Sequence, residues 1–305
     1  MIQVKNLQKH FGKHQVLKGI DFTINRGEIY GFLGQNGAGK TTTMNILTGL
    51  TSYREGEILI DGRSLEGNVE ELQKIIGYLP EDPQFYPYMK GIEYLEYIGK
   101  ISGYNQQDID KRNKELLKLV DLTEAASRKI GGYSRGMRQR LGLAVSVYNH
   151  PKILFLDEPS SALDPQGRRE LLDIILGLKD DNTTIFLSTH ILSDVEKICD
   201  RIAILHQGTI HLEESLETLQ ERYLQPVYEI QWEGNCSALK EPLLQHSWVD
   251  KININNNQMT LYVQDRKKAQ GKLLAVLSEY SLPMISLSLK RSSLEDIFVK
   301  VVNGK

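Results

Sequence analysis

The chain has few cysteines and no excess of charge of either sign. Its 305 residues include two cysteines, Cys199 and Cys236, which form no C-x-x-C pair and no Cys/His cluster. This scarcity argues against a disulfide framework or a zinc site and is consistent with a reducing cytosol. The 37 Lys and Arg residues nearly balance the 39 Asp and Glu residues, which leaves a formal net charge of -2. Such a balance gives no indication of a nucleic-acid partner or of binding to an anionic membrane surface.

Long apolar runs are also absent. The N-terminus lacks the basic-then-apolar pattern of a signal peptide, and no run approaches the roughly 18 to 20 apolar residues needed to span a bilayer. We therefore expect a cytoplasmic protein, and any membrane role would have to come through a partner. The length is sufficient for about two domains with a sizeable core.

What the chain does contain is a phosphate-binding pattern, G-x-x-x-x-G-K-[ST], at residues 34–41. It follows an apolar run at residues 28–33, which predicts a strand, and it precedes a helical pattern at residues 40–49. In such a P-loop, backbone N–H groups and the positive end of the helix bind the β- and γ-phosphates of a nucleotide. Lys40 supplies a mobile positive charge and Thr41 a hydroxyl ligand for Mg²⁺. The predicted nucleotide-binding residues of this loop are Gly34, Gln35, Asn36, Gly37, Ala38, Gly39, Lys40, Thr41 and Thr42.

A second apolar run ends in two adjacent carboxylates. Residues 152–156 read Lys-Ile-Leu-Phe-Leu and lead directly into Asp157 and Glu158. Because neighbouring side chains on a strand point to opposite sides, we expect Asp157 to face Mg²⁺ and Glu158 to face the γ-phosphate and polarise the attacking water. The alternative is a pair of solvated acids at a strand end. The preceding run, typical of a buried parallel strand, favours the catalytic interpretation.

Two further segments complete the candidate site. His190 follows the next apolar run, at residues 184–187. A lone histidine is more often structural, but one beside two catalytic acids can donate a hydrogen bond to the γ-phosphate. Ser134 precedes an amphipathic helical pattern and is a natural N-cap, which makes the start of that helix a candidate anion site. A cap without any other role remains the alternative for Ser134.

Read in order, these motifs resemble the ATP-binding subunit of an ATP-binding cassette (ABC) transporter over roughly residues 1–220. The resemblance implies an α/β P-loop fold with a RecA-like core, a β-rich N-terminal subdomain and a helical subdomain. It implies ATP and Mg²⁺ as cofactors, and a homodimer or paired cassette closed around two ATP molecules. It assigns Phe11 to adenine stacking, Ser134 and Gly136 to the signature loop, and Asp164 to the dimer-contacting loop 161–164. The implied catalytic residues are Lys40, Glu158 and His190. The implied metal ligands are Thr41, Glu81 and Asp157.

Three positions depart from the common pattern of this family. Arg135 replaces the first signature glycine, and Met137 replaces the usual glutamine. Glu81 stands where a glutamine usually senses the γ-phosphate, and a carboxylate can hold Mg²⁺ or water but cannot donate as an amide does. These variants, with a Ser-Leu-Glu-Asp-Ile-Phe string at residues 293–298, resemble the cassettes that serve type-2 permeases, mostly exporters of drugs, antibiotics or polysaccharides.

Aromatic residues follow Glu81 closely. These residues are consistent with an ordinary helix core. The family resemblance implies the alternative, a groove that binds a coupling helix of a membrane permease. In the second case the chain acts peripherally on the cytoplasmic face of the cell membrane. The six residues are Phe85, Tyr86, Tyr88, Tyr94, Tyr97 and Tyr104.

Beyond about residue 220 the sequence changes to shorter alternations. We expect the order strand, helix, strand, strand, helix, strand and one more helix, which resembles a ferredoxin-like fold. Ser292 and Glu295 form a capping box that would open the last helix. The predicted domains are therefore an ABC ATPase domain at 1–220 and a small α+β accessory or regulatory domain at 221–305.

The sequence thus favours an ATP-binding and ATP-hydrolysing subunit that dimerises around two ATP molecules and powers a separate permease, an exporter by resemblance. Two alternatives stay open: a soluble ABC-type ATPase without a membrane partner, and a nucleotide-gated regulatory module. The short spacing between Lys40 and Asp157 leaves no room for a long coiled coil, which counts against the first. The intact Glu158 and His190 count against the second.

Overall fold

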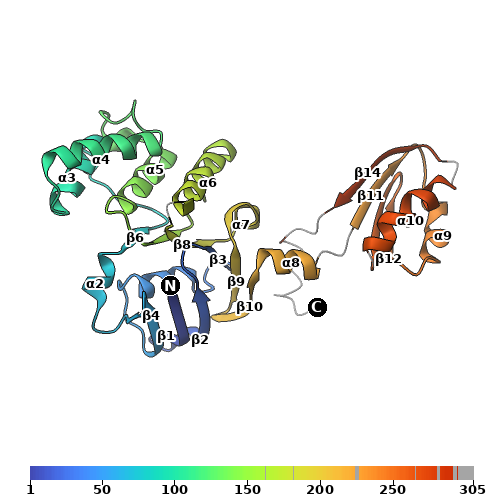
Figure 1. The fold of residues 1–305 in the computed structure, drawn as a ribbon, viewed down its shortest axis with the longest axis horizontal. Coiled ribbons are helices and arrows are strands. Elements are labelled where there is room, and N and C mark those ends of the chain that lie inside the picture. Colours follow the sequence, from blue (N-terminus) through green and yellow to red (C-terminus); the bar gives the residue numbers. More distant parts are fainter. Residues whose placement is uncertain are drawn as a thin grey trace. The chain divides into compact units, whose positions relative to one another are not determined.

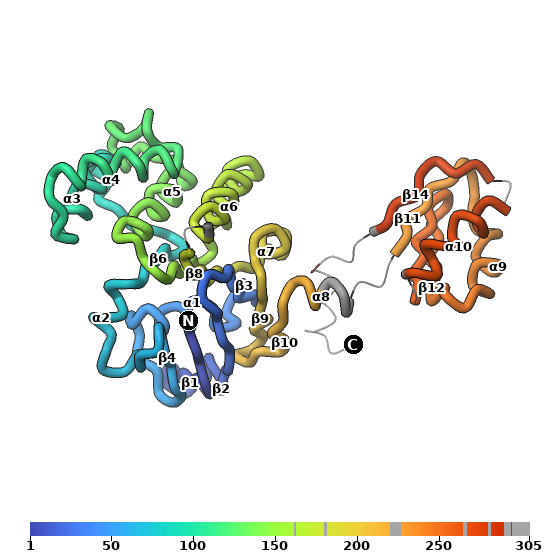
Figure 2. Tube along the Cα trace, in the orientation of Figure 1, coloured from blue at the N-terminus to red at the C-terminus, as the bar shows by residue number. Residues whose placement is uncertain are grey.

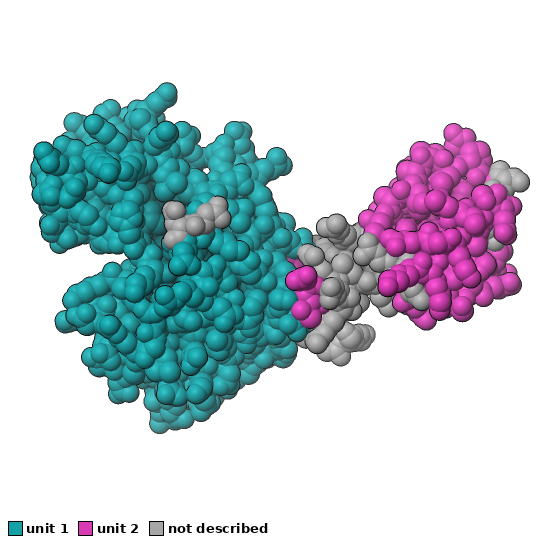
Figure 3. Space-filling model, in the orientation of Figure 1, with its two compact units in different colours: residues 1–216 teal, residues 217–305 magenta. Residues whose placement is uncertain are grey.

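A computed structural model describes residues 1–161, 163–180, 182–223, 227–264, 266–279, 282–290 and 294. The chain divides into two compact units, Met1–Leu216 and Glu217–Lys305, coloured teal and magenta in Figure 3. Each unit has a hydrophobic cluster of its own. Within the described ranges, no helix combines the length and the hydropathy that a membrane span requires. Apart from Leu294, the predicted last helix, with Ser292 and Glu295, lies outside the described residues.

A six-stranded sheet of order β10-β9-β3-β8-β7-β6 forms the centre of the first unit. All neighbouring pairs are parallel except β9 and β10. The strands β3, β7 and β8 are buried at every position, as expected for parallel strands covered on both faces. Their carboxyl ends meet at one edge of the sheet. The strands are β3 (Ile29–Leu33), β6 (Ile76–Leu79), β7 (Ile153–Asp157), β8 (Thr184–Thr189), β9 (Arg201–His206) and β10 (Thr209–Ser215).

The N-terminal strands form a second, antiparallel sheet of order β2-β1-β4-β5. It contains β1 (Ile2–Phe11), β2 (His14–Ile24), β4 (Glu55–Ile60) and β5 (Arg63–Ser64). The first strand continues beyond residue 7, where the apolar alternation stops, because it pairs with β2 as far as Phe11 opposite His14. This extension brings Phe11 to the tip of a hairpin, next to Gly12, whose φ of 59 suits a tight turn.

Helices complete the first unit. The phosphate-binding loop at residues 34–41 is called the cradle below, and α1 (Lys40–Leu47) begins at its end. Further along the chain come α2 (Val69–Gln73), α6 (Pro165–Asp180) after β7, and α7 (Leu192–Ile198) after β8. The helical group shown in green in Figure 1 contains α3 (Gly91–Ile101), α4 (Gln106–Leu119) and α5 (Arg135–Ser146). This group packs closely on β6, because a Cβ at Gly142 would lie 2.6 Å from Cδ1 of Leu79. The helical subdomain is therefore anchored beside the strands that carry the acids.

The second unit contains one antiparallel sheet of order β12-β13-β11-β14. After α8 (Leu216–Tyr223), the elements are β11 (Val227–Trp232), α9 (Lys240–Leu244), β12 (Val249–Asn255), β13 (Gln258–Val263), α10 (Arg266–Ser278) and β14 (Met284–Lys290), which run from orange to red in Figure 2. Apart from a short 3-10 turn before α9, this is the predicted ferredoxin-like order of strands and helices. Trp232, Leu261 and Leu273 belong to the cluster that joins sheet and helices.

Candidate active site

The glycine-rich loop lies between β3 and α1, and two of its glycines are required by close contacts. A Cβ at Gly34 would lie 2.5 Å from the carbonyl oxygen of Leu205, and one at Gly39 would lie 2.7 Å from Cδ2 of Leu17. Gly39 also has a φ of 116, which favours glycine. The loop is therefore held against β2 and β9 while its backbone leads into the N-terminus of α1, the end of a helix that attracts anions.

Lys40, the first residue of α1, is almost completely buried, with 6% of its side chain exposed. Its Nζ donates to the carbonyl oxygens of Gly34 (2.8 Å) and Gln35 (3.4 Å). The same atom lies 3.1 Å from Oε1 of Glu158. The ammonium group is thus positioned at the loop by oxygen acceptors, and a phosphate oxygen is the same kind of partner.

Glu158 joins the lysine to the histidine. Its Oε2 lies 2.9 Å from Nδ1 of His190, while its side chain is 6% exposed. The structure therefore brings the three predicted catalytic residues, Lys40, Glu158 and His190, into one connected chain of contacts. The role of Glu158 as the proton acceptor stays a prediction.

The two adjacent acids diverge for a different reason from the one predicted. Strand β7 ends at Asp157, and Glu158 has a left-handed φ of 47, so its side chain is directed by a turn and not by strand alternation. The N–H of Glu158 donates to the carbonyl oxygen of Ser188 (3.1 Å), which holds this turn against β8. A non-glycine residue in this conformation is unfavourable by roughly 1–2 kcal/mol, and such strain is often found at functional sites.

Ser188 is a site residue that the sequence interpretation missed. It pairs in register with Asp157 across β7 and β8, and its Oγ donates a short hydrogen bond to Oδ1 of Asp157. Its position at the polar end of an apolar strand, two residues before His190, was the available signal. Asp157 itself is 1% exposed, so this hydrogen bond compensates in part for burial of the carboxylate.

The loop after Glu158 is held by contacts of the buried Asp194 carboxylate. Ser160 Oγ donates to Oδ2 of Asp194 at 2.5 Å, and Asp194 Oδ1 lies 3.2 Å from Nε of Arg168. Asp194 belongs to α7 and Arg168 to α6, so these contacts tie the loop to both helices. No sequence motif indicated this arrangement, because the three residues come from separate segments.

The residues at the strand ends fit a magnesium ion that is shared with a nucleotide. Thr41 offers a hydroxyl from α1 and Asp157 a carboxylate from β7, and Mg²⁺ commonly binds one or two carboxylates together with phosphate oxygens and water. The described residues contain no cluster of three or more His, Cys, Asp or Glu side chains that would form a complete protein cage. Glu81 follows β6, the neighbour of β7, and is exposed. Its metal role stays a prediction.

Tyr78 on β6 stays neutral beside these acids. Burial, together with the negative charge of Asp157, raises the pKa of Tyr78 to about 12. Its hydroxyl donates to Oδ1 of Asn45 on α1 at 3.2 Å. At neutral pH the phenol therefore serves as a hydrogen-bonding link between β6 and the helix that follows the cradle.

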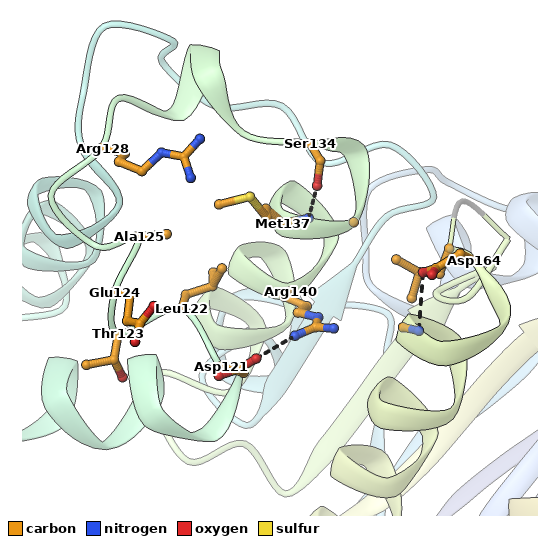
Figure 4. Close-up of a pocket in the computed structure, with 13 residues that line it drawn as sticks. Asp121, Leu122, Thr123, Glu124, Ala125, Arg128, Ser134, Met137, Arg140 and Asp164 are labelled. Atoms are coloured by element: carbon orange, nitrogen blue, oxygen red, sulfur yellow. Dashed lines mark hydrogen bonds and ion pairs between the residues drawn. The ribbon is translucent and has the colours of Figure 1, made fainter.

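Ser134 and its helix form one wall of a pocket of about 690 Å³ (Figure 4). Ser134 Oγ accepts a hydrogen bond from the N–H of Met137 at 3.2 Å, so the serine does cap α5. Gly136 lies against the loop before α6, because a Cβ there would be 2.8 Å from Cδ2 of Leu163. Arg140, which is drawn bonded to Asp121 in Figure 4, also forms an ion pair with Glu170 of α6.

Asp164 also lines this pocket. Its Oδ1 accepts from the N–H of Gly167 at 3.2 Å, the bond dashed at the right of Figure 4. Because Pro165 begins α6, this contact is that of a helix N-cap. Asp164, Ser134 and Gly136 thus share one pocket.

A P-loop that opens a helix beside the acid-bearing end of a parallel strand defines this protein as a P-loop nucleoside triphosphatase. Comparison with known proteins is more specific. Residues 17–161 match the model of the ABC transporter family, and residues 215–302 match the C-terminal domain of DrrA1-3-like ATP-binding proteins. The chain belongs to the ATP-binding proteins of ABC transporters.

Full-length relatives support this assignment. The ABC transporter ATP-binding protein YxlF of Bacillus subtilis (strain 168) is 37% identical over 304 residues, which is 100% of both chains. The bacitracin transport ATP-binding protein BcrA of Bacillus licheniformis is 34% identical over 100% of this chain and 98% of its own. The linearmycin resistance ATP-binding protein LnrL of Bacillus subtilis (strain 168) is 29% identical over 99% and 98%.

Solved structures agree over the first unit. An ATP-binding subunit of an ABC transporter is similar with a TM-score of 0.66 and 30% identity, over 73% of this chain and 93% of that one. The dimeric ATP-binding cassette MJ0796, in a post-hydrolysis state with ADP and Pi, has a TM-score of 0.65 and 27% identity over 71% of this chain and 99% of its own. The protein is therefore an ATP-binding, ATP-hydrolysing subunit of an ABC transporter, and the soluble alternative is not favoured.

Proposed function

We propose that this subunit dimerises around two MgATP molecules and uses their hydrolysis to drive a separate membrane permease that exports antibiotic-like compounds. The observation that carries this proposal is the contact chain at the carboxyl edge of the parallel sheet, in which the buried Lys40 and Glu158 connect to the half-exposed His190. The named functions of BcrA and LnrL support an antibiotic-related cargo. The dimeric form of MJ0796 supports a paired cassette.

Each site residue has a distinct task in this proposal. Glu158 accepts a proton from the attacking water, Lys40 holds a phosphate oxygen, and His190 orients Glu158 and donates toward the γ-phosphate. Mg²⁺, when bound, neutralises phosphate charge, and Thr41, Glu81 and Asp157 would hold it. The remaining proposed nucleotide contacts are Phe11 with adenine, the loop Gly34–Thr42 with the phosphates, and Ser134, Gly136 and Asp164 across the dimer.

Substitution Glu158→Gln tests the catalytic assignment. It removes the proton acceptor but keeps the side-chain shape, so ATP binding should persist while phosphate release falls by about 100-fold or more. Size-exclusion chromatography with MgATP should then show a trapped dimer. Glu233→Gln, an exposed acid in the second unit, is the matched control and should turn over normally. Normal turnover of Glu158→Gln would refute the base assignment, and a persistent monomer would refute the ATP-dependent dimer.

The aromatic residues after β6 form two sets that differ in their exposure to solvent. Phe85 and Tyr94 stack edge to face, with ring centroids 5.0 Å apart, and Tyr104 packs against Tyr148 at 5.8 Å. Tyr86 and Tyr88, by contrast, stack on each other at 5.7 Å while 48% and 68% exposed. We propose that this exposed pair, supported by Tyr97, docks the permease at the cytoplasmic face of the membrane, since tyrosines anchor protein interfaces.

Charge substitutions test this docking surface. Tyr86→Asp and Tyr88→Asp should abolish co-purification with the membrane permease and leave the affinity for MgATP unchanged. Leu50→Asp, at a residue 60% exposed in the same unit, controls for the added charge. Loss of ATP binding in the tyrosine variants would instead identify the pair as part of the fold, and unchanged co-purification would exclude the surface.

We further propose that residues 1–220 form the ATPase domain and that 221–305 form an accessory domain, which supports the dimer or regulates the permease. The separate sheet and the separate hydrophobic cluster of the second unit favour such a division. Truncation after Gln220 should leave ATP binding intact and weaken dimerisation or permease control. Unchanged assembly and regulation would contradict this role.

A further inference from the structure

Lys9 and Phe11 lie two residues apart near the end of β1 and contact each other. The Lys9 ammonium lies 4.8 Å from the centroid of the Phe11 ring, within the range of a cation–π interaction. The same ammonium donates a short hydrogen bond to the carbonyl oxygen of Ser52. Phe11 remains 54% exposed, which is unusual for a phenylalanine and leaves much of its ring free of protein contact.

The hairpin that carries this pair adjoins the phosphate cradle. Val16 and Leu17 of β2 pack on Gly39, with distances of 3.5 and 2.7 Å from a Cβ built there. Ser52 lies just beyond α1, in a loop that folds back on the helix: the N–H groups of Leu50 and Thr51 both donate to the carbonyl oxygen of Asn45. Lys9 therefore connects the tip of the hairpin to the far end of the helix that begins at the cradle.

We propose that Lys9 is a positioning residue for the nucleotide base: it holds the Phe11 ring from one face and leaves the opposite face for a purine. This inference rests on the proposed function, in which Phe11 stacks on adenine. A planar ring has two faces, each with negative charge density. A cation on one face draws that density away from the other, which favours stacking of an electron-rich purine there. The carbonyl of Ser52 fixes the cation, and the cation fixes the ring.

Lys5 provides a contrast on the same strand. Its Nζ lies 3.7 Å from Oε2 of Glu57, and both side chains are largely exposed. Such a surface pair contributes little to stability. Lys5→Ala thus removes a lysine from β1 without altering the aromatic pair, and it is the matched control.

The experiment compares the binding of MgATP and of inorganic tripolyphosphate by isothermal titration calorimetry. Lys9→Ala should weaken MgATP binding about two- to fivefold, the range expected for an exposed cation–π interaction. Tripolyphosphate has no base, so its affinity should not change. Lys9→Arg should restore MgATP binding, because a guanidinium also binds aromatic faces. In a Phe11→Ala background, Lys9→Ala should have no further effect.

Other results would overturn the inference. An equal loss for both ligands would show that Lys9 acts on the cradle through Ser52, and tighter MgATP binding by Lys9→Ala would show that the lysine competes with the base. Unchanged MgATP binding would show that Lys9 has no part in it. A wild-type protein that binds tripolyphosphate but gains nothing from the base would overturn the inference and the Phe11–adenine contact while leaving the ATPase proposal intact, whereas one that binds neither ligand would overturn the proposed function as a whole.

Discussion

The two units of the chain bury different kinds of side chain. Among the described residues, every buried charged or polar side chain lies in the first unit, including Lys40, Asp157, Glu158 and Asp194. The buried side chains of the second unit are aliphatic, aromatic or sulfur-containing. Burial of a charge is unfavourable unless it is paired and hydrogen-bonded, so such groups persist where chemistry requires them. The difference supports the proposal that the catalytic residues lie in the first unit.

The strands of the two units show the same difference. Every residue of β7 is buried, whereas β13 alternates between buried and more exposed positions. A parallel strand covered on both faces ends in a protected edge, where side chains can act away from water. An antiparallel strand with one open face offers no such edge.

The largest expected effect comes from Lys40→Ala. This change removes the cation from the cradle and leaves the buried Glu158 without its partner. ATP hydrolysis should fall by about 100- to 1000-fold, comparable to the removal of a preorganised electrostatic group. Lys251→Ala, at an exposed lysine of the second unit, should keep wild-type turnover in the same phosphate-release assay. Equal losses of turnover in both variants would show that the two units do not differ in their contribution to ATP hydrolysis.

Trp232→Ala should destabilise the second unit by about 3–5 kcal/mol, since it empties a large site in a packed core. Trp232 is 1% exposed in the cluster of that unit. The chain has two tryptophans, and the other one, Trp248, lies in the same cluster. Its fluorescence therefore reports unfolding of the second unit alone.

The measurement for Trp232→Ala is urea unfolding followed by Trp248 fluorescence, alongside MgATP binding at each urea concentration. The fluorescence midpoint should fall while the midpoint for loss of ATP binding stays at its wild-type value. Coincident shifts of both midpoints would show that the units unfold as one.

A smaller effect is expected for Ser188→Ala. It deprives the buried Oδ1 of Asp157 of its donor, at a cost of about 1–3 kcal/mol. We expect a lower thermal unfolding midpoint and slower ATP turnover. The control is Ser288→Ala, because the hydroxyl of the exposed Ser288 donates a long 3.5 Å bond to the carbonyl oxygen of Glu229. Unchanged stability of Ser188→Ala would mean that the short hydrogen bond makes no net contribution.

The smallest effect concerns alkaline pH. The pKa of Tyr78 is raised from 10.0 to about 12, so the folded protein favours the neutral phenol more than the unfolded chain does. Its contribution is complete below about pH 10 and is lost as the pH rises toward 12. In Tyr78→Phe, the unfolding midpoint should fall less over this interval than in the wild type. Parallel curves for the two proteins would exclude this contribution.

The cradle could be predicted from sequence because its chemistry is local. Eight consecutive residues specify the loop, and the apolar run before it specifies the strand. The same holds for Asp157 and Glu158, which follow a buried strand directly. The order of elements in the second unit was also predictable, since each element has its own periodicity. These features depend on neighbours in the chain.

The contacts between distant segments could not be predicted in this way. The pairing of Ser188 with Asp157 depends on the register of β7 and β8, and the contact of Lys9 with Ser52 depends on how β1 lies against the loop after α1. Sequence alternation also gave the wrong reason for the divergence of the two acids, because nothing local indicated the left-handed backbone at Glu158. The strands β6, β9 and β10 were not predicted from the sequence.

The left-handed backbone at Glu158 limits which residues natural variation or engineering can place there. Glycine and asparagine suit that conformation but bring no acid, and aspartate suits it better than glutamate but has a shorter reach. The Glu158 carboxylate contacts both Lys40 and His190. Position 158 is therefore a compromise between conformational preference and reach, and a substitution that relaxes the backbone should yield a more stable protein and a poorer enzyme.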